Sequence, residues 1–98
     1  MDIRHLKYFE SIARNKNFTK AAEELFISQP SLSNMIKKME ENFGSKLIER
    51  TTREVILTEM GEALYVHAKK ILGLYTITLK EMEEIKKIGK GEIHIGII

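Results

Sequence analysis

The stretch TKAAEELFISQPSLSNMIKK, residues Thr19–Lys38, decides the fold of this chain. It predicts a short helix, a tight turn and a second helix. Thr19 is expected to cap the first helix, because its hydroxyl can accept a hydrogen bond from an unpaired backbone N–H. Residues 21–25 favour helix by composition. Ser28 is the expected cap of the second helix, and Pro30 fits its first turn, where a missing N–H removes no helical bond.

The second helix is amphipathic. Its apolar positions recur at spacings of four, three and four residues, as on a helix face that packs against a core: Leu32, Ile36, Met39 and Phe43. The opposite face carries an amide, small side chains and lysines: Gln29, Pro30, Ser33, Asn34, Lys37 and Lys38. An amide can bond a base edge, small side chains permit close approach, and lysines can bind phosphate. The amide and the hydroxyls gather at the N-terminal end, which a recognition helix inserts into the major groove of DNA.

An ordinary helical hairpin with a solvated polar face would show part of this pattern. Here two capped helices, the small pair Ala21–Ala22 and the run Ser28-Gln29-Pro30 coincide. The combination favours a helix-turn-helix.

The flanking residues predict a third helix and a wing. Asp2 is expected to cap a helix with the apolar stripe Ile3, Leu6, Phe9, Ile12 and Ala13. Gly44 is expected to end the recognition helix. Residues 46–50 and 54–57 are short β-prone runs, which predict a two-stranded wing pinned to the core by Leu47, Ile48, Val55 and Leu57. Arg50 would lie at its base and Arg53 at its tip, from which an arginine can enter the minor groove.

A long helix follows the wing. Thr58 is its expected cap, and the helix would run to Ile88, roughly 46 Å at 1.5 Å per residue. Its apolar residues follow a near-heptad pattern and predict a dimerisation seam: Leu64, Ala68, Ile71, Leu72, Tyr75, Leu79 and Met82. Packing within one subunit would account for the first half of the helix alone. A second copy is therefore the expected partner.

Composition excludes several classes of protein. The chain has 98 residues, a net charge of +2, 43% hydrophobic and 31% charged residues, which suits a soluble globular chain. It has no cysteine, and its three histidines lie in different predicted elements, so neither a metal site nor an enzyme is expected. No signal peptide and no apolar run of ~20 residues are found, which predicts a cytoplasmic protein without membrane contact.

The chain resembles the N-terminal region of the LysR-type transcriptional regulators, bacterial winged helix-turn-helix proteins, over essentially its whole length. The most specific motifs are FTKAAEELFISQPSLSNMIKKMEENFGSKLIERT, residues Phe18–Thr51, and LTEMGE, residues Leu57–Glu62. The ending GEIHIGII is similar to the first strand of the family's effector-sensing domain. The expected fold is thus mainly α: a winged helix-turn-helix at 1–57, a linker or dimerisation helix at 58–88, and the start of an effector-binding domain at 89–98.

The resemblance implies a transcriptional regulator that binds an interrupted palindrome of double-stranded DNA as a homodimer, with linker helices paired antiparallel. It implies that this chain binds no cofactor and that a domain outside these residues binds a small-molecule co-inducer. It leaves open whether a full-length protein would be a dimer or a tetramer. By motif position, Gln29, Pro30 and Ser33 would face bases, Thr19, Ser31 and Lys37 would make backbone or flanking contacts, and Arg53 would enter the minor groove.

The sequence departs from the family pattern at one position. Asn34 stands where the family commonly has a basic residue. It can bond adenine but carries no charge, so Lys37 or Lys38 would have to compensate. The full predicted DNA-binding set is Thr19, Ser28, Gln29, Pro30, Ser31, Ser33, Asn34, Lys37, Lys38, Arg50 and Arg53.

The alternative is a helical dimerisation or adaptor module that binds no DNA. Such a module would explain the long helix. It would not explain why Ser28, Gln29, Pro30 and Ser33 cluster at one helix start, or why an arginine stands at the tip of a wing.

Overall fold

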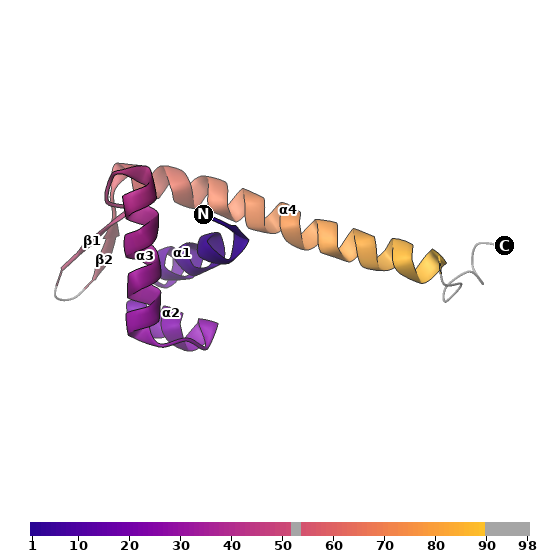
Figure 1. Ribbon diagram of the computed structural model, residues 1–98, viewed down its shortest axis with the longest axis horizontal. Coiled ribbons are helices and arrows are strands. Elements are labelled where there is room, and N and C mark those ends of the chain that lie inside the picture. Colours follow the sequence, from indigo (N-terminus) through magenta and orange to yellow (C-terminus); the bar gives the residue numbers. More distant parts are fainter. Residues whose placement is uncertain (52–53, 90–98) are drawn as a thin grey trace.

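The computed structural model describes residues 1–51 and 54–89. Within these ranges the chain forms four α-helices and a two-stranded sheet, in the order α1, α2, α3, β1, β2, α4. Figure 1 shows α1, α2, α3 and the strands gathered into one body, from which α4 extends to one side. The expected winged helix-turn-helix with a long C-terminal helix is confirmed.

Helix α1 spans Ile3–Asn15 and begins as predicted. The Asp2 side chain accepts a hydrogen bond from the His5 N–H at 3.1 Å. The helix ends at Lys16, which adopts a left-handed conformation. Its buried stripe includes Phe9 and Ile12, both fully covered, so the apolar spacing identified the face that packs on the core.

Helix α2 spans Phe18–Leu25, and its predicted cap was wrong. Asn17 caps the helix, because its side-chain oxygen accepts the Lys20 N–H at 2.8 Å, while Thr19 lies inside the first turn. The reason is tertiary: Phe18 is 8% exposed and belongs to the core, and a helix that starts at Phe18 carries its ring there.

A polar network joins α2 to α1. Glu24 of α2 accepts hydrogen bonds from Ser11 Oγ at 2.6 Å and from Arg14 Nη1 at 3.0 Å. Arg14 also pairs with Glu10 one turn earlier on its own helix. The Arg14 guanidinium, with the Ser11 hydroxyl, lowers the pKa of Glu24 to about 2. The network fixes α2 against α1 outside the apolar core.

Helix α3 spans Gln29–Phe43 and is the expected recognition helix. Leu32, Ile36 and Met39 are buried as predicted. Phe43 is 40% exposed, so its placement in the core was wrong. It is the last residue of α3, where the helix ends at Gly44 with φ +70°, a conformation that glycine adopts without strain.

The wing is an antiparallel pair, β1 at Ile48–Arg50 and β2 at Val55–Leu57, with Arg50 opposite Val55. Both strands are shorter than predicted. At the start of β1 the Glu40 carboxylate of α3 accepts the N–H groups of Leu47 at 2.8 Å and Ile48 at 3.3 Å. These bonds tie the wing to the recognition helix.

Side chains of the wing also reach the core. Leu47, Ile48 and Val55 are buried in the core cluster, and Leu57 is partly buried against it. The prediction that these four residues pin the wing is confirmed.

Helix α4 spans Glu59–Gly89, one residue beyond the predicted end. Thr58 begins it as expected: its hydroxyl accepts the Gly61 N–H at 3.0 Å and donates to the Lys46 carbonyl at 2.7 Å. The predicted strand at the C-terminus lies outside the described residues. Within the described ranges, no helix has the length and hydropathy that crossing a membrane requires.

Candidate nucleic-acid interface

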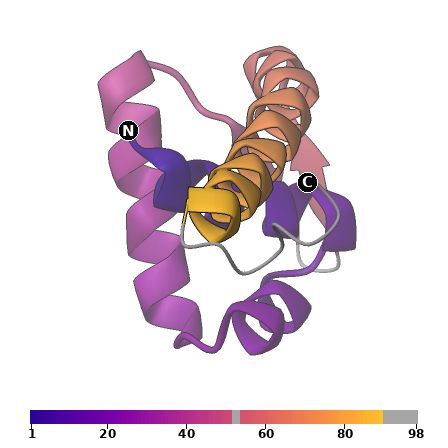
Figure 2. The same cartoon turned by 90° about the vertical axis from the view of Figure 1, so that its right-hand side faces the viewer.

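The N-terminal face of α3 is the surface on which the predicted contacts meet. Figures 1 and 2 show α3 along one side of the body, with α2 at its N-terminal end. The opposite face of α3 is buried, whereas almost every residue at this end that was predicted to contact DNA is exposed: Ser28, Gln29, Pro30, Ser31, Asn34, Lys37 and Lys38. Ser33 is half-buried. The helix therefore presents a polar face to solvent from a fixed position.

Ser28 holds the start of this face. Its Oγ accepts the Ser31 N–H at 3.2 Å and donates to the Ser31 hydroxyl at 2.8 Å. Ser28 is thus confirmed as the cap, and the two serines are bonded to each other. Pro30 lies in the first turn, where the helix needs no N–H from it.

Thr19 and Gln29 lie close together across the turn of the helix-turn-helix. Thr19 Oγ1 donates to Gln29 Oε1 at 3.5 Å, the outer limit for a hydrogen bond. The contact leaves the Gln29 NH₂ group as the free end of the amide. Although Thr19 is not the helix cap, it adjoins the residue that the sequence predicted to read a base.

Arg50 was predicted at the base of the wing, but it is the last residue of β1, paired with Val55 next to the wing loop. Its Nη2 donates to Ser33 Oγ at 2.6 Å, and its guanidinium carbon lies 3.9 Å from the centre of the Phe18 ring. One side chain therefore connects β1, α2 and α3. No periodicity could have revealed this, because Ser33 and Arg50 are separated by 17 residues.

The two lysines remain free for phosphate. Lys37 and Lys38 are exposed, and neither forms an ion pair with a carboxylate in the part of the chain that the structure describes. Asn34 is exposed on the same helix between them and the N-terminus. Arg53, the predicted minor-groove contact, lies outside the described residues.

The predicted dimerisation residues differ in their exposure within the single chain. Ala68 is fully buried within the single chain and Leu64 packs against its core, so neither is exposed to a second copy as predicted. Leu72 is half-buried. The others are exposed: Ile71, Tyr75, Leu79 and Met82. The first half of the predicted seam thus faces its own subunit, and the second half stays a prediction.

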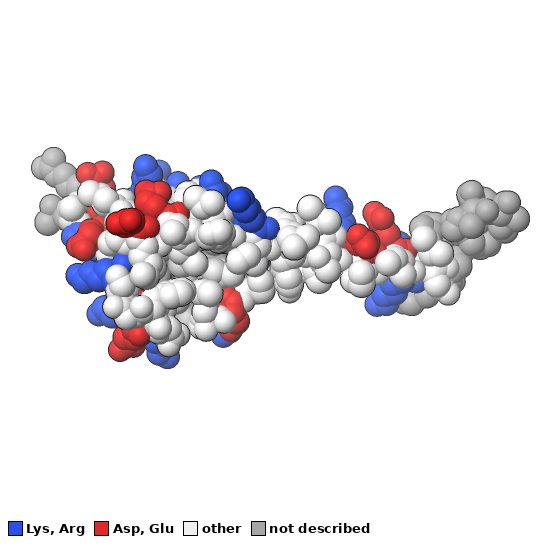
Figure 3. Space-filling model, turned by 90° about the horizontal axis from the view of Figure 1, so that it is seen from above, with Lys and Arg blue, Asp and Glu red and all other residues white. Residues whose placement is uncertain are grey.

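The sequence prediction omitted several exposed apolar residues of α4. Leu74 is 65% and Ile77 is 61% exposed, more than any residue of the predicted seam. From Ile71 to Leu79 the helix carries no charged side chain. Figure 3 shows this segment as a white band between charged residues near the body and charged residues toward the C-terminal end. An uncharged nine-residue run was the sequence signal for a helix that is apolar on more than one side.

The fold is that of the winged helix-turn-helix proteins. It has a three-helix body, a helix-turn-helix with an exposed polar face, and an adjacent two-stranded wing. The family model described as the bacterial regulatory helix-turn-helix protein of the lysR family matches residues 3–62. The chain belongs to this family.

Curated relatives agree with this assignment. The chain is 47% identical over 97 residues to the HTH-type transcriptional regulator BudR of Klebsiella aerogenes, covering 99% of this chain and 68% of that protein. It is 38% identical over 99 residues to the DNA-binding transcriptional dual regulator OxyR of Escherichia coli K12, covering 100% of this chain and 32% of OxyR. The chain thus spans about a third of OxyR's length.

Solved structures agree in fold as well. The DNA-binding domain of BenM in complex with catB site 1 DNA matches with a TM-score of 0.84 at 38% identity, covering 88% of this chain and 97% of that one. The complex of the CbnR DNA-binding domain with DNA matches with a TM-score of 0.80 at 32% identity, covering 88% and 99%.

Proposed function

We propose that this chain is the DNA-binding part of a transcriptional regulator and recognises a specific sequence in double-stranded DNA. The observation that carries the proposal is the exposed N-terminal face of α3, set beside a wing in a fold that BenM and CbnR use in complexes with DNA. Helix α3 would enter the major groove, and the wing would contact the minor groove.

Each group on this face has a separate task. Lys37 and Lys38 would bind phosphates and set the register on the duplex, which supplies affinity without sequence information. Gln29 and Ser33 would contact base edges. Arg53 keeps its predicted role at the wing tip.

The DNA-binding test compares a duplex selected by this chain from a random pool with a scrambled duplex of the same composition. Gln29→Ala should cost ~1–3 kcal/mol on the selected duplex and little on the scrambled one. Asn42→Ala is the matched control, because it removes an exposed amide at the far end of the same helix. Equal losses on both duplexes would refute the role of Gln29.

The same assay separates a regulator from an adaptor module. Binding of a regulator to DNA should weaken steeply as salt is raised, since counterions are released from the phosphates it contacts. An adaptor would show no salt-dependent binding to either duplex.

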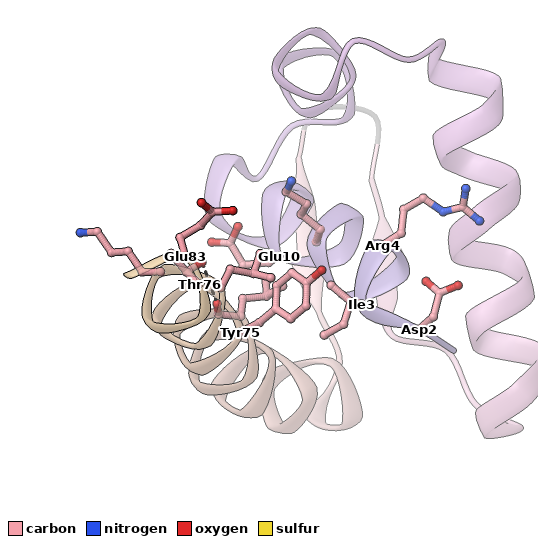
Figure 4. A pocket seen from close by; sticks show the side chains of 11 residues that line it. Asp2, Ile3, Arg4, Glu10, Tyr75, Thr76 and Glu83 are labelled. Carbon is pink, nitrogen blue, oxygen red and sulfur yellow. Dashed lines mark hydrogen bonds between the residues drawn. The ribbon is translucent and has the colours of Figure 1, made fainter. Parts of the chain in front are cut away.

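We further propose that α4 pairs with α4 of a second copy. Between α1 and α4 lies an open groove of about 990 Å³. Figure 4 shows Tyr75 of α4 reaching across it toward Ile3 of α1. Charged residues of both signs line its margin: Asp2, Arg4, Lys7, Glu10, Lys80 and Glu83. An apolar centre with a charged margin is typical of a protein interface, and pairing would place two recognition helices about 34 Å apart on one face of the duplex.

The dimer is tested by sedimentation. Ile71→Asp should yield a monomer, because dimerisation would bury an unpaired charge. Ile71 is 41% exposed in the single chain, so its own fold should survive. Lys70→Asp, which introduces the same carboxylate one residue away at an already charged position, is the control. An Ile71→Asp chain that still sediments as a dimer would place the interface elsewhere.

Two further proposals follow from the family. A longer protein with this N-terminal region would bind a small-molecule co-inducer through another domain, and a DNA-binding bacterial regulator would act in the cytoplasm. Small molecules that shift the DNA affinity of such a protein, but not of this chain, would support the first.

A further inference from the structure

The contact between Arg50 and Ser33 bears on how the recognition helix reads a base, and the inference rests on the proposed function. Arg50 is the last residue of β1, and its backbone is held by pairing with Val55 of β2. Its guanidinium stacks on Phe18, a core residue that is 8% exposed. The paired strand, the ring contact and the hydrogen bond to Ser33 together restrain the guanidinium.

The direction of the hydrogen bond determines what Ser33 can do. A guanidinium has only donors, so the Ser33 oxygen must accept from Arg50 and its O–H hydrogen is left to donate elsewhere. A serine or threonine hydroxyl in a helix often donates that hydrogen to the backbone carbonyl four residues earlier. Thr76 and Thr78 of α4 do so, at 3.0 and 2.7 Å. Among the described residues, the Ser33 hydroxyl donates to no such carbonyl.

Gln29 lies one turn before Ser33, and its side-chain oxygen also accepts a hydrogen bond from the protein. Thr19 donates to its amide oxygen, which leaves the NH₂ group as the free end. Gln29 and Ser33, two of the three residues predicted to face bases, thus each keep a hydrogen-bond donor for the base. In the major groove, acceptors are presented by guanine O6 and N7, adenine N7 and thymine O4. The face is arranged to read acceptor edges.

We propose that Arg50 is a positioning residue for sequence readout: it holds the Ser33 hydroxyl as a donor to a base acceptor. This differs from the role first expected for Arg50, that of a DNA contact at the base of the wing. As a direct DNA contact, Arg50 would contribute through its positive charge, and the planar shape of its guanidinium would not matter for binding. The two roles predict opposite results for a substitution that keeps the charge.

The decisive variant is Arg50→Lys. Lysine keeps the positive charge but loses the planar group that stacks on Phe18 and reaches Ser33. Binding of the 98-residue chain is measured on the selected and scrambled duplexes over a range of salt. Arg50→Lys should reduce the preference for the selected duplex roughly three- to tenfold and leave the salt slope unchanged. Ser33→Ala should reduce the preference by a similar factor.

The double variant tests whether Arg50 acts through Ser33. If it does, Arg50→Lys combined with Ser33→Ala should lose no more preference than Ser33→Ala alone. Independent contacts would multiply their losses, which would overturn the proposal. Unchanged preference in Arg50→Lys would also overturn it, as would an equal loss on both duplexes.

A measurement without DNA separates this inference from the proposed function. The ring current of Phe18 should shift the Arg50 side-chain proton resonances in the free chain, and Phe18→Leu should remove the shift. Its absence in the wild type would overturn the contact, even if the chain binds DNA as proposed. A wild-type chain that binds both duplexes equally would instead overturn the proposed function, whatever the resonances show.

Discussion

Gly61 should be irreplaceable, although it lies in a helix, where alanine is usually the better residue. A Cβ built at Gly61 would lie 2.1 Å from the backbone oxygen of Leu47 and 3.1 Å from its carbonyl carbon. Real Cβ atoms do not approach an oxygen so closely, and backbone cannot turn away as a side chain can. Gly61→Ala should therefore push α4 away from the loop that precedes the wing.

The cost can be worked out from three contributions. Overpacking of this kind costs ~1–3 kcal/mol. The displaced carbonyl also accepts the Thr58 N–H at 3.0 Å, and loss of that bond costs about 1 kcal/mol. Alanine returns up to ~1 kcal/mol by its helix propensity. The net destabilisation is about 1–3 kcal/mol, which corresponds to a decrease in Tm of roughly 5–20 °C for a domain of this size.

Gly73→Ala is the matched control. Gly73 lies in the same helix, and a Cβ there meets nothing within 4 Å. Alanine should stabilise the chain at this position by about 0.5–1 kcal/mol. Both variants are compared by thermal unfolding at one protein concentration, because dimerisation would make Tm depend on concentration. A Gly61→Ala chain as stable as Gly73→Ala would refute the steric argument.

Three other predictions concern charged residues. Lys37→Ala should weaken binding to selected and scrambled DNA alike and lower the salt slope by about one; an unchanged slope would mean that Lys37 touches no phosphate. Glu40→Ala should destabilise the chain by about 1.5–3 kcal/mol in thermal unfolding, because two N–H groups of the wing lose a charged acceptor; an unchanged Tm would show that the apolar contacts alone hold the wing. The stability difference between wild type and Glu24→Gln should be present above pH 4.5, shrink as the pH falls, and be lost near pH 2. The reason is that Arg14 lowers the pKa of Glu24 from 4.5 to about 2 in the folded chain. A difference that grows on acidification would contradict this assignment.

Residues that act within one helical turn were predictable from the sequence. Asp2, Ser28 and Thr58 bond N–H groups three residues ahead, as their side chains favour. The buried faces of α1 and α3 follow the helix period. The error at Thr19 arose because Asn17 and Thr19, on either side of Phe18, could both cap the helix, and the burial of Phe18 decided between them.

The candidate site was predicted in its position but not in its internal contacts. The polar face of α3 lies where the spacing placed it. Arg50 was expected at the base of the wing as a DNA contact, and nothing in the sequence indicated that it is bonded to Ser33 and stacked on Phe18. Ala68 was assigned to the dimer seam, but its own subunit buries it. A heptad pattern shows that a helix face is apolar, and it cannot show which surface covers that face.

By itself, the amino-acid sequence determined the helices, most of their ends, the faces they bury and the family to which the chain belongs. These depend on neighbours a few residues apart, whose geometry the backbone repeats in every helix. Only the tertiary structure decided that Glu40 holds the wing, that Gly61 lies against Leu47 and that Arg50 donates a hydrogen bond to Ser33. Each of these contacts joins residues that do not lie in the same helix, so it exists only once the core has brought their elements together.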